Sequence, residues 1–466
     1  MRAPAAALGM IALLSGCAAG PNYRPKSPDA LGVPEHYTAP ARDEATAELV
    51  RWWTQFNDPA LGNLVEQALE ANLDIAQAVA RLRQARAALV QSRADFFPTI
   101  DASAGAGRNF DDDRPDTSSY SIGANAGWTI DLFGGTRRSV EASKADLQAA
   151  GYDLASVRTA IIAEVVSNYI GLRATQARLG IARDVLVTQE ENYQIADWRV
   201  QAGLVSSLDV EQARTQRALT RASIPAFENA IAAARNRLAV LTGLAPGVVA
   251  DELMMTGPIP AGPGELAVGI PADTLRQRPD VRAAERTLAA ATARIGVAQA
   301  QLLPALSISG NVGTSALSTG GLGDIVTGGL FATLGQLIFD GGRRLAVVRA
   351  QRAAAEGALA AYRQSVLLAL EDVENGLVFL KSAGERQAAI ADALESADNA
   401  AILARSQYRA GLTDFQTLLD AERQLLNARD SLASAKADQA TALVQLYLAL
   451  GGGWDPLAPL PDGRQP

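Results

Sequence analysis

The length of the helical periodicity is what most constrains this chain. Small apolar residues recur at spacings of three and four from about Thr136 to Gln201 and from about Arg343 to Tyr408. A helix of about 65 residues is roughly 100 Å long at 1.5 Å per residue, which no compact domain accommodates. Helices of this length occur as coiled coils, membrane spans or helical repeats. These segments are too polar to span lipid, so we predict coiled-coil packing.

Shorter segments with the same periodicity accompany the two long ones. They are expected at about Pro59 to Phe97, Leu208 to Thr242, Pro271 to Leu303 and Phe415 to Leu450. All are rich in Ala, which permits the close approach of helices that the thin wall of a tube requires.

Four segments between the helices have the two-residue period of β-strands, at about residues 99–109, 119–131, 305–314 and 330–340. From Tyr120 to Ile130 every second residue is apolar, and the residues between are small or polar. About eleven residues suffice to cross a bilayer, and the alternation suits lipid on one side and a wet lumen on the other. An ordinary half-buried antiparallel sheet has the same period, so both interpretations stand on this pattern.

The chain repeats itself at an offset of about 206 to 208 residues. Pro98 corresponds to Pro304, Gly134-Gly135 to Gly341-Gly342, and each half contains one Ala-Gly-Leu turn. Each half therefore consists of helix, hairpin, long helix, tight turn and helix. We place the first repeat at residues 58–243 and the second at 270–451, with a linker at 244–269 and a tail at 452–466.

Four strands cannot close a barrel, and an open edge in lipid leaves unpaired backbone groups that cost several kcal/mol each. Because the smallest bacterial barrels have about eight strands, several chains must share one barrel. The predicted fold is a mixed one of all-α coiled coil and transmembrane β-structure. Each chain gives four strands to the barrel and its long helices to a tube below.

The N-terminal residues have the pattern of a secretory signal. Arg2 precedes a short apolar run, and Leu14-Ser15-Gly16-Cys17 is similar to a bacterial lipobox, in which the cysteine is acylated after cleavage. We expect a signal peptide at residues 1–16, lipid such as palmitate on Cys17, and an extended strap at residues 17–57, Pro-rich in its first part. A chance cysteine in an ordinary signal peptide is the alternative. By resemblance to lipoproteins, Ala18 favours sorting to the outer membrane.

Composition excludes several classes of function. The formal net charge is −8 without a basic block, which argues against a nucleic-acid partner. With one cysteine and one histidine, His36, the chain can form no internal disulfide, no Cys/His metal cluster and no His-based triad. We therefore expect no enzyme, no metal and no cofactor besides the covalent lipid. Aromatic residues are 5% of the chain, which indicates no large aromatic core.

Several motifs together resemble the TolC-like outer-membrane factor family, in its NodT-type lipoprotein branch. They are Cys17 to Pro25, Trp52 to Pro59, Ile270 to Glu285 and the paired Ala-Gly-Leu turns. The resemblance covers nearly the whole mature chain. It implies a homotrimer with a 12-stranded barrel in outer-membrane lipid, a helical tunnel across the periplasm, and a periplasmic adaptor and inner-membrane pump at its far end. It implies efflux of small molecules such as drugs; the alternatives are type I protein secretion and a non-conducting structural lipoprotein.

The resemblance also implies a gate at the turn end of the helices. Asp209 and Tyr408 match a hydrogen-bonded pair of the family's closed state, and Asp420 matches a ring of carboxylates inside the constriction. Such a ring favours cations. For Asp209 a helix N-cap after Ser206-Ser207 is the simpler explanation, and for Asp420 it is a solvated helix face.

The sequence departs from the family's gate at three positions. Thr417 stands where a second acidic ring is expected, Thr413 where a basic residue is expected, and Leu208 where its polar partner is expected. A hydrophobic constriction can therefore share the role of the gate.

The two turns are the expected adaptor contacts, through Gly203, Leu204, Gly411 and Leu412. The need for glycine where the chain reverses explains two of these residues without an adaptor, and both explanations can hold.

Overall fold

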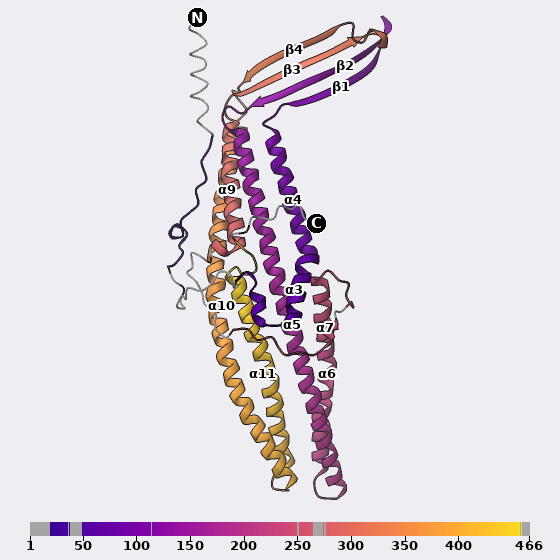
Figure 1. Ribbon diagram of the computed structural model, residues 1–466, viewed down its shortest axis with the longest axis vertical. Helices are drawn as coiled ribbons and strands as arrows, with labels where there is room; N and C mark the ends of the chain where they lie inside the picture. Colours follow the sequence, from indigo (N-terminus) through magenta and orange to yellow (C-terminus); the bar gives the residue numbers. More distant parts are fainter. Residues whose placement is uncertain are drawn as a thin grey trace.

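The computed structural model describes residues 19–35, 37, 49–112, 114–248, 251–263, 274, 276–456 and 458. Cys17, His36 and the expected signal peptide lie outside the described residues. The described chain is long and narrow, with a β-sheet at one end and two helical turns at the other (Figure 1).

Helices form the shaft. The two longest, α5 (Gly135–Gln201) and α10 (Arg343–Arg409), have 67 residues each and run from the sheet to the turns (Figure 1). The other helices are α3 (Pro59–Ala71), α4 (Leu73–Ala94), α6 (Ser207–Leu241), the short α7 (Asp251–Met254), α9 (Pro279–Ala300) and α11 (Phe415–Ala449). Lengths recur between the halves, with 22 residues in α4 and α9 and 35 in α6 and α11. Among the described residues, no helix is both long enough and apolar enough to cross a membrane.

The helix expected from Pro59 to Phe97 is broken at Asn72. The Asn72 backbone is extended (φ −67°, ψ 132°), and its side chain accepts the N–H groups of Asp74 and Ile75 at the start of α4. Its amide also donates to the Leu241 carbonyl at 2.9 Å. Asn is a favoured N-cap, but the apolar periodicity continues across a break of one residue and does not reveal it.

The helix expected from Pro271 to Leu303 has different bounds in the structure. Residues 271–273 lie outside the described chain, and α9 itself begins at Pro279 and ends at Ala300. Pro279 takes the first helical position, where its missing N–H has no intrahelical partner to lose.

The strands form one antiparallel sheet in the order β1-β2-β3-β4. They are β1 (Thr99–Asp111), β2 (Arg114–Ile130), β3 (Ala305–Ala316) and β4 (Val326–Gly335). The pairing of β2 with β3 joins the two halves of the chain. Within the described chain, β1 and β4 are the free edges of the sheet.

The register brings the apolar residues of all four strands onto one face. Ala102 lies opposite Ala124, which lies opposite Val312, and Leu306 lies opposite Leu334. Because side chains alternate between faces, residues opposite one another share a face. The other face carries Asp101 and otherwise mostly Gly, Ser, Thr and Asn, with Phe331 as its one large apolar residue in the paired register. No other described residues cover the apolar face, and Leu330 is 80% exposed.

The fourth strand is shifted from its expected position at residues 330–340. It ends at Gly335, whose partner Ala305 begins β3 directly after Pro304. Proline has no N–H for the next bond of the ladder, so the pairing stops there. Ile338 and Phe339 lie beyond the strand and are exposed.

The core lies midway along the shaft and contains an aromatic cluster that the composition did not indicate. Trp52, Trp53 and Phe56 are at most 5% exposed. Trp52 stacks on Tyr447 with ring centroids 5.1 Å apart. Asp58 caps α3 and accepts a hydrogen bond from the Tyr169 hydroxyl at 2.7 Å. The Trp52 to Pro59 motif is therefore structural: it closes the core around α3.

Candidate functional site at the helical tips

Both expected adaptor turns have the same backbone geometry. Gly203 (φ +70°) donates to the Val200 carbonyl and Leu204 to the Arg199 carbonyl, both at 2.9 Å. Gly411 (φ +76°) and Leu412 repeat the pattern with Tyr408 and Gln407, at 3.1 and 2.9 Å. This is the Schellman motif, which favours glycine at the left-handed position.

A Cβ at either turn glycine would meet no atom within 4 Å, so the positive φ alone requires glycine there. The leucines that follow, Leu204 and Leu412, are 72% and 79% exposed. The reversal of the chain therefore explains the glycines and leaves the exposed leucines without an explanation from the fold.

The N-cap explanation of Asp209 is wrong. Ser206 caps α6, since its hydroxyl accepts the Leu208 N–H at 3.2 Å. Asp209 is the third residue of that helix. At the other turn, Asp414 caps α11 by accepting the Thr417 N–H at 2.8 Å.

The Tyr408–Asp209 hydrogen bond that the resemblance implies is absent from this structure. Tyr408 is 3% exposed, and its hydroxyl has no hydrogen-bond partner among the described residues. The Arg199 guanidinium lies over the Tyr408 ring, with Cζ 4.3 Å from the centroid, and donates to the Tyr408 carbonyl at 3.1 Å. The Phe415 ring also packs against it, at 5.4 Å between centroids. Arg199 and Phe415 thus hold Tyr408 through its ring and backbone.

Asp209 nevertheless belongs to the same electrostatic group. Partial burial raises the pKa of Asp209, the Asp414 carboxylate raises it further, and Arg199 lowers it. Burial likewise raises the pKa of Tyr408, while Arg199 lowers it and Asp209 raises it. The structure therefore brings residues from both turns into one group, although the expected bond is not formed.

The remaining expected gate residues lie on the surface of the single chain. Asp420 is exposed and accepts from the Gln416 amide at 3.0 and 3.1 Å, with Arg423 at 3.5 Å. Thr417 and Leu208 are also exposed. These positions suit a lumen wall and a solvated helix face equally well.

Contacts that the sequence did not indicate join the α5/α6 hairpin to the α10/α11 hairpin, and we call them the interhairpin seam. The Asn192 amide donates to Glu422 at 2.6 Å, and Arg178 pairs with Asp430 through two bonds of 2.6 and 3.0 Å. Arg423 also donates to Gln216 at 2.8 Å. A buried apolar cluster lies alongside: Ala196, Ala213, Ala404, Tyr408, Phe415, Leu418 and Leu419.

Glu422 is the buried centre of the seam. It is 9% exposed and also pairs with Arg405 of α10 at 3.4 Å. Asn192 and Glu422 are 230 residues apart in sequence, and Arg178 and Asp430 are 252 apart. No local pattern predicts pairs at that separation.

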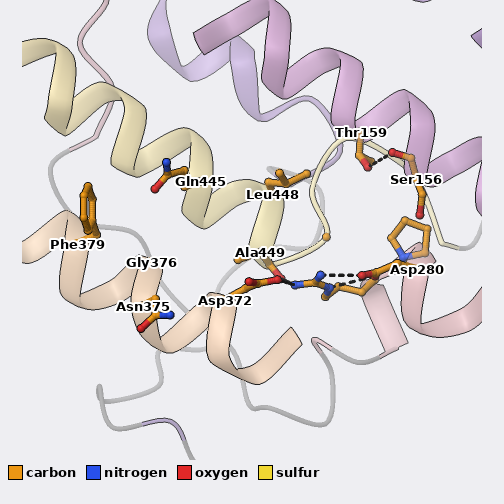
Figure 2. A pocket seen from close by; sticks show the side chains of 13 residues that line it. Ser156, Thr159, Asp280, Asp372, Asn375, Gly376, Phe379, Gln445, Leu448 and Ala449 are labelled. Carbon is orange, nitrogen blue, oxygen red and sulfur yellow. Dashed lines mark hydrogen bonds and ion pairs between the residues drawn. The ribbon is translucent and has the colours of Figure 1, made fainter. Parts of the chain in front are cut away.

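A pocket of about 420 Å³ lies where α9 begins and α11 ends (Figure 2). Arg278 on its wall forms two bonds with Asp280, at 3.0 and 2.7 Å, and one with Asp372 at 2.8 Å. It also donates to the Ala449 carbonyl at 3.2 Å. Through these bonds Arg278 links α9, α10 and α11, so its charge is already paired. The pocket therefore has a structural role. Nowhere in the described chain, this pocket included, are three His, Cys, Asp or Glu side chains grouped so as to hold a metal ion.

Comparison with known proteins agrees with this architecture. Residues 64–244 and 270–452 match the family described as outer membrane efflux protein. Nodulation protein T of Rhizobium leguminosarum bv. trifolii is 32% identical over 454 residues, which is 96% of each chain. The toluene efflux pump outer membrane protein TtgC of Pseudomonas putida is 31% identical over 462 residues, covering 95% of this chain and 94% of that protein. The solved outer-membrane channel OprN is 38% identical with a TM-score of 0.84, covering 94% of this chain and all of that one. The chain belongs to the outer membrane efflux protein family.

Proposed function

We propose that this protein is the outer-membrane exit duct of a tripartite efflux system. Small molecules pass through it passively, from pump and adaptor across the periplasm and the outer membrane. The observation that carries the proposal is the four-stranded sheet above the long helices, with one apolar face and two free edges. The family consists of channels, so the protein is a duct and not an enzyme.

We propose that three copies close one 12-stranded barrel. Free edges in lipid would leave β1 and β4 with unpaired backbone groups, and joining β4 of one copy to β1 of the next removes both edges. The exposed apolar face then contacts lipid, and the Gly, Ser, Thr and Asn face lines the lumen. The matching helix lengths and the two family matches support an internal repeat.

We propose that the exposed leucines of the two turns, Leu204 and Leu412, contact a periplasmic adaptor that links the duct to an inner-membrane pump. Both turns lie at the end of the molecule far from the sheet (Figure 1), and the two leucines are exposed there, where a partner can reach them. Lipid on Cys17 would anchor the chain at the outer membrane, as the lipobox predicts.

The decisive experiment is single-channel conductance of the purified protein in a planar bilayer, beside Asp420→Asn. We expect small, cation-selective openings for the wild type, because a ring of exposed carboxylates in the lumen attracts cations. Asp420→Asn should weaken the cation selectivity, measured as the reversal potential in a KCl gradient. If the folded protein did not conduct, the alternative of a non-conducting structural lipoprotein would be favoured. Conductance wide enough for an unfolded polypeptide would favour type I secretion.

Acidification should favour the closed tips. Because the pKa of Asp209 is raised where the two turns meet, protonation stabilises that contact. The stabilisation is complete below the ordinary carboxyl pKa of about 3.9 and is lost as the pH rises through the raised value. Open probability should therefore fall as the pH is lowered through the raised pKa of Asp209.

Asp209→Asn should remove this pH dependence. Asp414 does not cause this pH dependence, because its bonds with Thr417 lower its pKa. The stability that Asp414 contributes is lost only when the pH falls below the ordinary carboxyl range. An unchanged pH response in Asp209→Asn would show that another group is responsible.

A further inference from the structure

The first described residues lie against α5 and α9, next to the turn that joins β2 to α5. The Ala19 N–H donates to the Phe133 carbonyl at 2.8 Å, in the turn between β2 and α5. The Arg138 side chain, 5% exposed, donates to the Ala19 carbonyl at 3.0 Å and the Gly20 carbonyl at 3.3 Å. It also donates to the Asn22 side chain at 2.5 Å. We call residues 19–23 with these contacts the strap seat.

Arg138 depends on the strap for most of its hydrogen bonds. A guanidinium has five N–H donors and cannot lose its charge in a protein. Three of the four bonds that Arg138 donates go to the strap, and the fourth goes to Glu141 at 2.6 Å. Release of the strap would leave a buried cation with one carboxylate that is itself 45% exposed. A buried charge without hydrogen-bond partners costs free energy, so Arg138 stabilises the state in which the strap is bound.

Two glycines let the strap lie directly on α9. Gly20 has φ +90°, and a Cβ there would come within 2.4 Å of the Gly296 Cα. A Cβ on Gly296 would come within 2.6 Å of the Ala19 carbonyl oxygen and 2.8 Å of Arg138 Cγ. Neither side of this contact has room for a side chain.

The strap is held further along as well. The Tyr23 hydroxyl donates to Glu285 at 2.9 Å, and the Arg286 guanidinium lies 5.5 Å from the Tyr23 ring. Beyond it, Leu31 and Val33 are buried in a small apolar cluster with α9 and α10. The buried Leu31 and Val33 would keep the later part of the strap on the shaft if the seat at Arg138 were lost, so the release would be confined to the residues before them.

We infer that Arg138 is a positioning residue for the N-terminal anchor. Cys17 precedes Ala19 by only two residues in the sequence, and Ala19 lies at the foot of the sheet, bonded to Phe133. Acyl chains on Cys17 enter the bilayer beside the junction of β2 and α5, level with the base of the barrel. This inference rests on the proposed acylation of Cys17, and it adds where the lipid is held and which residue holds it.

The test is the rate at which trypsin cuts after the exposed Lys26 in the full-length protein, reconstituted in lipid vesicles. Arg138→Gln removes the donors, and Gly296→Ala fills the contact without changing charge. We expect cleavage about tenfold faster in both, because each releases the strap. Arg138→Lys should give an intermediate rate, since an ammonium replaces only part of the fork.

Matched controls separate the seat from general stability. Arg137→Gln alters the neighbouring arginine, whose side chain is 51% exposed, and Gly180→Ala adds a Cβ that meets nothing within 4 Å. Trypsin should cut both variants after Lys26 at the wild-type rate. Cleavage after the exposed Lys381 in α10 should be the same in all variants, whereas general destabilisation would raise it.

Equal cleavage after Lys26 in wild type, Arg138→Gln and Gly296→Ala would overturn the inference. Mass spectrometry of the N-terminal peptide gives the second criterion, since an unmodified Cys17 would leave no anchor to position. Neither readout depends on conductance, so a folded chain that fails to conduct would count against the proposed function alone.

Discussion

Replacing Glu422 with Ala is expected to raise the open fraction of the channel about tenfold or more. Glu422 is 9% exposed and accepts a hydrogen bond from Asn192 across the interhairpin seam. A buried donor left without a partner costs about 1–3 kcal/mol, and each 1.4 kcal/mol is about tenfold in an equilibrium. We propose that the tips open by separating the two hairpins, so loss of the Asn192 bond, which joins them, destabilises the closed tips more than the open ones. Single-channel recording measures the open fraction directly.

Three variants test this assignment. Glu422→Gln keeps an acceptor for Asn192 and should stay closer to the wild type. Asn192→Ala should open the channel as Glu422→Ala does, and the double variant should add little, because both remove the same bond. Tyr408→Phe should change the open fraction little, since the hydroxyl it removes has no partner in the described chain. A large effect of Tyr408→Phe beside none for Glu422→Ala would place the latch at the tyrosine instead.

Replacing Trp52 with Ala should cost about 3–5 kcal/mol of stability, the usual range for removal of a large buried aromatic. Trp52 is 1% exposed and packs between Tyr447, Trp53 and Phe56, so its loss opens a cavity where the strap, α3 and α11 meet. A large membrane protein unfolds irreversibly, so the measurement is the half-life of the folded protein at fixed high temperature.

Trp52→Phe is the matched control, because it keeps a ring against Tyr447 and leaves a smaller cavity. We expect its half-life to fall between those of the wild type and Trp52→Ala. Equal half-lives for the wild type and Trp52→Ala would contradict the role of this cluster as the core of the shaft.

Local patterns in the sequence determined the elements of this protein. The spacing of apolar residues predicted α5 and α10 to within about two residues, because a buried face must recur with the helical period. The two-residue period located three of the four strands, and Gly203 and Gly411 marked the turns because few other residues adopt a positive φ. The family motifs indicated a channel before any contact was known.

Tertiary structure alone decided which residues meet. Asn72 bonds the Leu241 carbonyl, 169 residues away in sequence, and the end of β4 depends on its partner strand. The tips show the same limit, because Tyr408 is held by Arg199 from another helix and Glu422 meets Asn192 across 230 residues of sequence. Periodicity reports which face of an element is buried, and it carries no information about which distant side chain lies opposite. The sequence therefore determined the shaft, the sheet and the turns, while the contacts that hold the tips together arise only when the two hairpins pack.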